Sequence, residues 1–254
     1  MMSSPWVMMA VIAAAGLVSS FVTAAIGIGG GLIVMPILAL AYPPREIVAL
    51  TAPMFMANAI VTLWLYRKTF GTRRGYLSIP GILVGIGVGA RVLAVMPAAG
   101  LRILIGLIVF GFLVVELIWR RQSHDSSGLP LWTGLPLSLL SGGVSAVSNI
   151  GGTIISMYLL EPGVAPAMFV GTISFLYVIM TGVKLLVFGG MGIVSWATIW
   201  PALPSLVTIV LGAKVGKGLN GRISATGFRW TVVSVMGVSA FFLLLRGQLL
   251  GATS

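Results

Sequence analysis

The sequence contains no cysteine, a single histidine and only four acidic residues. The lack of cysteine excludes disulfide bonds, thiol catalysis and thiolate metal sites. An enzyme needs a nucleophile with a base, a pair of carboxylates or a metal site, and this chain has few residues that supply any of them. We therefore expect no enzymatic activity, no metal and no cofactor.

Charged side chains of either sign are also scarce, at 7% of the 254 residues against 58% hydrophobic. A soluble domain carries about 25% charged residues, so this chain cannot cover itself with polar surface. The composition predicts an all-α, multi-pass protein of the cell (cytoplasmic) membrane that faces the lipid bilayer. Its net charge of +11 is typical of the Lys and Arg surplus that holds loops in the cytoplasm, and we expect no nucleic-acid partner.

Glycine, by contrast, is abundant, with 34 residues, and two clusters of it interrupt very apolar segments. The first cluster lies in AIGIGGGLIVMP, which begins at Ala25, and the second in AVSNIGGTIIS, which begins at Ala146. Glycine costs a helix about 1 kcal/mol relative to alanine. The sequence therefore predicts a break in the helix at each cluster.

Apolar segments occur at residues 5–42, 47–66, 76–96, 101–119, 129–160, 166–188, 194–213 and 224–245. A membrane-spanning helix needs about 20 residues. The first and fifth segments are longer than one span, and these two hold the glycine clusters. Each is either a hairpin that enters and leaves on one side of the membrane or a single bent span.

The distribution of positive charge favours hairpins. If all eight segments cross once, seven basic residues lie on one side and six on the other. If the first and fifth segments return, ten lie on one side against at most five, which is the asymmetry that cytoplasmic loops show. The ten are Arg67, Lys68, Arg73, Arg74, Arg120, Arg121, Lys214, Lys217, Arg222 and Arg229. This topology places the N- and C-termini outside.

Three motifs recur between the halves in nearly one register. Ile28-Gly29-Gly30-Gly31 aligns with Ile150-Gly151-Gly152-Thr153, Gly27 with Asn149, Thr51 with Thr172, and Gly89-Ala90-Arg91 with Gly212-Ala213-Lys214, at offsets of 122, 121 and 123 residues. Such duplication indicates a repeat. With hairpins the halves have opposite orientation, as in many secondary transporters. We predict a first inverted repeat at 1–120, a cytoplasmic linker at 121–128 and a second inverted repeat at 129–254. Each repeat is a glycine-broken helical hairpin plus three transmembrane helices.

These residues resemble a known family. A hydrophobic run with GIGGG and the pair Met35-Pro36, followed by PPREIVALT and GARV, is similar to the TauE/SafE family of sulfite and sulfonate exporters. The likeness covers nearly the whole chain, but the second half has Ser148-Asn149-Ile150-Gly151-Gly152-Thr153 as its glycine run and no proline where Pro36 would align. The resemblance implies outward transport of sulfite, sulfoacetate or another small organic anion.

The two breaks also predict a binding site. Each would free backbone N–H groups at the start of a half-helix, where the helix dipole favours an anion. Hairpins from opposite faces would meet near the midplane. The candidate substrate-binding residues are Gly27, Ile28, Gly29, Gly30, Gly31, Thr51, Asn58, Arg91, Ser148, Asn149, Ile150, Gly151, Gly152, Thr153, Thr172 and Lys214.

Structural explanations compete with this site. Glycines also allow close helix packing when they are spaced four residues apart, which is how we interpret Gly81, Gly85 and Gly89. A threonine can bond to its own helix, and Asn58 would serve equally well in an interhelical hydrogen bond. The basic side chains of Arg91 and Lys214 either attract anions or extend to the lipid headgroups. For Lys184 we expect the second.

Several functions fit the sequence. The favoured one is export of a small sulfur oxyanion by alternating access. We expect the membrane potential to drive it, because no buried carboxylate stands out as an ion carrier, although coupled export stays open. Alternatives are a passive anion channel, a carrier of another small organic anion, and an assembly subunit without transport. The small-residue faces would support a homodimer.

Overall fold

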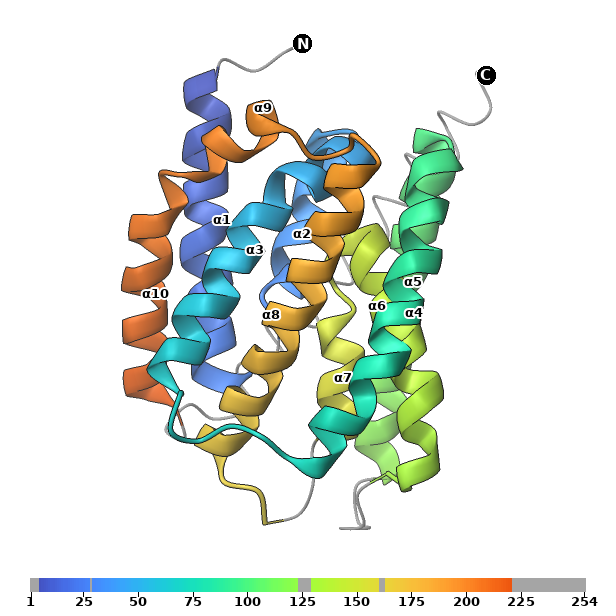
Figure 1. Ribbon diagram of the computed structural model, residues 1–254, viewed down its shortest axis with the longest axis vertical. Helices are drawn as coiled ribbons and strands as arrows, with labels where there is room; N and C mark the ends of the chain where they lie inside the picture. Colours follow the sequence, from blue (N-terminus) through green and yellow to red (C-terminus); the bar gives the residue numbers. More distant parts are fainter. Residues whose placement is uncertain (1–4, 28, 123–128, 160–162, 221–254) are drawn as a thin grey trace.

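The computed structural model describes residues 5–27, 29–122, 129–159 and 163–220, and every regular element within these ranges is a helix (Figure 1). The prediction of an all-α membrane protein is confirmed, since five helices are long and apolar enough to cross a membrane, or six if one bent pair counts as a span. The elements are α1 (Pro5–Ile26), α2 (Gly31–Ala41), α3 (Pro44–Leu65), α4 (Arg73–Val95), α5 (Ala98–Gln122), η1 (Leu131–Thr133), α6 (Gly134–Ser148), α7 (Gly152–Leu159), α8 (Pro166–Gly190), α9 (Trp196–Ile199), η2 (Trp200–Ala202) and α10 (Ser205–Leu219).

The first long apolar segment is broken as predicted. Helix α1 ends at Ile26, and the next residue, Gly27, has a φ of +77°, a left-handed conformation that glycine adopts at little cost. Helix α2 starts at Gly31 and returns toward the end at which α1 began (Figure 1). Pro43 and Pro44 then stop the return and start α3, because proline fits the first turn of a helix but cannot continue one.

The second long segment is broken in the same way. Helix α6 ends at Ser148, and Asn149 takes a left-handed φ of 57°, which no other non-glycine residue has in the described ranges. Asparagine tolerates this region better than most side chains do. Helix α7 then turns back toward the end from which α6 came, opposite to the end used by α1 and α2 (Figure 1).

Small residues let the two halves pack closely. Helix α1 packs against α10, and α4 against α6. A Cβ atom on Gly212 or Gly216 would collide with the backbone of α1, and one on Gly85 or Gly89 would collide with the backbone of α6. The packing role expected for Gly81, Gly85 and Gly89 is therefore confirmed. Because α1 and α6 are each paired with a helix of the other half, the hairpins are held between the halves.

One span differs from the expected segment 194–213. The structure has a short helix α9 and a 3-10 turn η2, followed by α10 at a bend of 48°. Pro201 lies in the turn and Pro204 directly precedes α10. Proline removes a backbone donor and clashes with the preceding turn, which explains the break. The last predicted span, 224–245, lies outside the described residues, so the inverted repeat and its division at 121–128 stay predictions.

Four basic residues of the described ranges lie at the two ends of the molecule. Helices α3 and α10 end, and α4 begins, at the lower end of Figure 1, which brings Arg67, Arg73 and Lys217 to that end. Arg45 lies at the opposite end, where its guanidinium donates to the carbonyl oxygens of Leu93, Ala94 and Met96. These carbonyls belong to the end of α4 and lack helical partners, so Arg45 joins α3 to α4. The assignment of the lower end to the cytoplasm stays a prediction.

Candidate functional site between two broken hairpins

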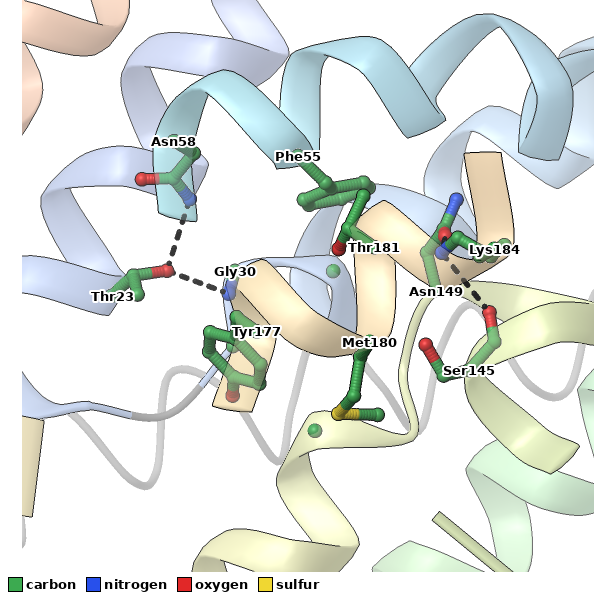
Figure 2. Close-up of a pocket in the computed structure, with 13 residues that line it drawn as sticks. Thr23, Gly30, Phe55, Asn58, Ser145, Asn149, Tyr177, Met180, Thr181 and Lys184 are labelled. Atoms are coloured by element: carbon green, nitrogen blue, oxygen red, sulfur yellow. Dashed lines mark hydrogen bonds between the residues drawn. The ribbon is translucent and has the colours of Figure 1, made fainter. Parts of the chain in front are cut away.

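A buried cavity of about 30 Å³ lies where the two helix breaks meet. Because a water molecule needs about 10–15 Å³ of such space, there is room only for a small solute. Its walls come from α1, both breaks, α3, α6 and α8 (Figure 2). The lining residues are Thr23, Gly29, Gly30, Gly31, Phe55, Asn58, Ser145, Asn149, Gly152, Tyr177, Met180, Thr181 and Lys184. None of these side chains is acidic.

On one side of the cavity, a neutral hydrogen-bond network holds the first break, with Thr23 at its centre. The Thr23 hydroxyl accepts from the Gly30 N–H at 3.3 Å and from the Asn58 side-chain amide at 3.2 Å, and it donates to the Ser19 carbonyl at 2.8 Å. The Asn58 amide also donates to the Ser19 hydroxyl at 3.1 Å, and its oxygen accepts from Thr62 at 3.2 Å. These groups, whose side chains are all buried, fix the start of α2 to α1 and α3.

On the other side, the second break is bonded to the amine of a buried lysine (Figure 2). The amine of Lys184, on α8, donates to the Asn149 side-chain oxygen and, at 3.4 Å, to the Ser145 carbonyl. The Asn149 amide nitrogen in turn donates to the Thr51 hydroxyl at 3.0 Å and to the Val48 carbonyl at 3.4 Å. Asn149, which directly follows α6, therefore connects α8 to α3.

The glycines at the breaks are required by close contacts as well as by conformation. A Cβ on Gly30 would overlap the backbone of Ser19, and a Cβ on Gly152 would overlap the ring of Tyr177. The Tyr177 hydroxyl also lies 2.8 Å from where a Cβ of Gly29 would stand and donates to the Gly27 carbonyl at 3.5 Å. Tyr177 is thus wedged between the two breaks, and only glycine leaves space for it.

Six of the predicted site residues line the cavity: Gly29, Gly30, Gly31, Asn58, Asn149 and Gly152. Of these, Gly152 is the first residue of α7. The predicted residues Gly27, Thr51, Ser148, Ile150, Gly151 and Thr153 lie in or beside the breaks without lining the cavity.

The remaining predicted residues lie elsewhere. Thr172 accepts from the N–H of Gly71 at 3.2 Å, so it holds the loop between α3 and α4 rather than a solute. Arg91 and Lys214 are exposed and do not line the cavity. Each follows a glycine, Gly89 or Gly212, that contacts the neighbouring helix. Any role for them in attracting anions stays a prediction. Ile28 lies outside the described residues.

The sequence analysis missed several lining residues, and its own repeat register would have found four of them. Thr23 and Ser145 are 122 residues apart, as are Phe55 and Tyr177, and each pair occupies corresponding places at the two breaks. The expectation for Lys184 was wrong, since its side chain is 1% exposed and turns into the cavity instead of extending to the headgroups. Helix α8 continues beyond Lys184 to Gly190, so this residue is not at the end of its helix.

The helical fold and the cavity define a multi-pass membrane protein with an internal polar site, as secondary transporters have. A family model described as "Sulfite exporter TauE/SafE" matches residues 12–243. The chain therefore belongs to the TauE/SafE family, which is a family of membrane transporters. Searches among curated proteins and among solved structures found no significant match.

Proposed function

We propose that this protein exports a small sulfur oxyanion, sulfite or an organosulfonate such as sulfoacetate, by alternating access, and that the substrate binds in the cavity between the two broken hairpins. The observation that carries the proposal is the convergence of both glycine breaks on one cavity, which polar and apolar residues line together. Non-helical backbone at membrane depth is tolerated where it is buried in protein or lines a cavity, and a binding site accounts for why two such breaks occur together.

The groups around the cavity match an oxyanion. The wall of the cavity holds amide and hydroxyl groups and no carboxylate. The starts of α2 and α7 face this region, and helix N-termini carry about half a positive charge. A solute with a negative charge would be favoured beside these helix starts, whereas a cation would meet no anionic ligand.

The membrane potential would drive this export without a coupled ion. An inside-negative potential favours the exit of an anion by about 2.3 kcal/mol per charge per 100 mV. None of the lining residues is an acid that would carry a proton or sodium ion. An export rate that does not change with the membrane potential and depends strictly on a proton gradient would contradict this mechanism.

The test is transport of radiolabelled sulfite by purified protein in liposomes. Gly30→Val is expected to abolish uptake, because the side chain would overlap the Ser19 backbone. Gly87→Val is the matched control, since Gly87 lies in α4 with open space around its Cβ position. Unlabelled sulfite on the opposite side of the membrane should accelerate uptake of the labelled sulfite, because carriers exchange one substrate molecule for another. Equal uptake by wild type and Gly30→Val, with both variants folded by size-exclusion chromatography, would contradict the site. Measurable single-channel current would favour a passive channel instead.

A further inference from the structure

Lys184 is a buried basic side chain that has no acidic partner among the residues that the structure describes. Its side chain is 1% exposed, and it lies on α8, one of the helices apolar enough to cross the membrane. Within the described part of the chain, its only hydrogen-bond acceptors are the Asn149 side-chain oxygen and the Ser145 carbonyl, which are both neutral. A charged side chain at this depth is costly and tends to mark a functional site.

The surroundings of Lys184 leave room for a further partner. A protonated lysine has three N–H donors, and the two neutral oxygens account for two of them. The side chain lines the cavity, so the third donor has access to a solute there. A charge-assisted hydrogen bond to an anion is about twice as strong as a neutral one.

Asn149 is placed to keep this lysine in position. Its backbone is fixed in the left-handed conformation at the end of α6, and its amide nitrogen is bonded to Thr51 of α3. Its oxygen is therefore presented to Lys184 from a rigid base. A neutral amide oxygen holds the amine without neutralising its charge. An aspartate at the same position would neutralise that charge.

We propose that Lys184 is the residue by which the cavity recognises the negative charge of its substrate, with Asn149 as its positioning residue. The inference rests on the proposed function and goes further, because it assigns charge recognition to one side chain rather than to the backbone donors of the breaks. It predicts a substrate class defined by a full negative charge on a small oxygen-bearing group, so that a neutral molecule of the same shape binds poorly.

The first test compares methanesulfonate with methanesulfonamide, which share a shape but differ in charge, by isothermal titration calorimetry on the purified full-length protein. Lys184→Met should weaken methanesulfonate binding by at least about tenfold, as expected for loss of a hydrogen bond to a charged group, and leave the weak response to the sulfonamide unchanged. Lys68→Met, at an exposed lysine in the loop after α3, is the control and should bind as wild type does. Lys184→Arg should retain part of the affinity, because it keeps the charge.

The second test places a carboxylate beside the lysine. Asn149→Asp keeps the side-chain shape and the tolerance for a left-handed backbone, but pairs Lys184 internally, so methanesulfonate binding should be lost. Because the substitution also removes the amide donor to Thr51 and Val48, size-exclusion chromatography must show that the variant is folded. If Lys184→Met or Asn149→Asp binds methanesulfonate like wild type, charge recognition by Lys184 is wrong even though the export proposal stands. If wild type itself binds neither methanesulfonate nor sulfite, the proposed function fails.

Discussion

The tips of the two hairpins share one design but differ in charge. In the first, Ser19 and Thr23 of α1 pack against Gly30, and in the second, Ser141 and Ser145 of α6 pack against Gly151. Ser141 and Ser145 follow Ser19 and Thr23 at the same distance of 122 residues. The backbone break and its small-residue contact are therefore the common element of both tips.

The side chain that completes each tip is where they differ. The first tip is completed by the amide of Asn58, which is engaged with Ser19, Thr23 and Thr62. The second is completed by the amine of Lys184, whose acceptors in the described ranges are both neutral. A closed network stabilises a fold, whereas an incompletely bonded cation is available to a ligand. On our proposal, the first tip is mainly a rigid support and the second provides recognition.

The largest expected effect concerns the shared element. Gly30→Ala and Gly151→Ala each place a Cβ atom against the backbone of the preceding helix, at Ser19 and at the Ser141 carbonyl respectively. Backbone cannot rotate away, so both substitutions should destabilise the protein by about 1–3 kcal/mol or more. Thermal unfolding in detergent measures this, with Gly87→Ala, which meets no neighbour, as the control. A pair of unequal melting temperatures would show that the two tips are not built alike.

The next prediction separates the supporting tip from the recognising tip. Thr23→Val removes the hydroxyl that the Gly30 N–H and the Asn58 amide share, and an unsatisfied buried donor costs about 1–3 kcal/mol. The side-chain hydroxyl of Ser145 makes no hydrogen bond in the described part of the chain, so Ser145→Ala should cost much less. Chemical or thermal denaturation of the two variants tests the difference. Equal losses would contradict the division of roles.

A smaller effect is expected where the obstacle is a side chain. Gly152→Ala overlaps the ring of Tyr177, and a ring can move where a backbone cannot. We expect an intermediate loss of sulfite transport that is relieved in the double variant Gly152→Ala/Tyr177→Leu. Initial rates in liposomes measure both. No relief in the double variant would mean that the glycine is needed for its own conformation.

The smallest effect is expected at the exposed cations. Arg91→Gln and Lys214→Gln should leave equilibrium binding of methanesulfonate unchanged, because neither residue lines the cavity. If they attract anions from either side, only the transport rate falls, and the difference disappears at high ionic strength, since salt screens exposed charges. A loss of affinity measured by calorimetry would place them closer to the substrate than the structure does.

The sequence predicted those parts of the molecule that depend on local conformation. The glycine clusters predicted both breaks, and charge counting predicted that each long segment folds back. The bend before α10 was missed, because a hydropathy segment does not show where Pro201 and Pro204 interrupt a helix. The left-handed Asn149 was aligned with Gly27 from spacing alone, and both positions have positive φ.

The site was predicted less completely, because hydropathy does not tell which face of a helix turns inward. Lys184 was assigned to the headgroups from its distance to the end of an apolar segment, whereas the face of α8 that carries Tyr177, Met180 and Thr181 turns it toward the cavity. Arg91 and Lys214 were selected because they are basic residues at the ends of apolar segments and align with each other in the repeat. Recurrence there reflects the adjoining glycines, Gly89 and Gly212, which contact the neighbouring helices.

Substrate protection of a single thiol tests the central claim most directly. The chain has no cysteine, so the variant Thr181→Cys has a single thiol. Thr181 lies on the wall of the cavity. The account predicts that methanesulfonate slows its labelling by N-ethylmaleimide, while Lys68→Cys in the exposed loop reacts at the same rate with or without the anion. Labelling of Thr181→Cys that is unaffected by any concentration of anion supporting transport would contradict a binding site between the two breaks.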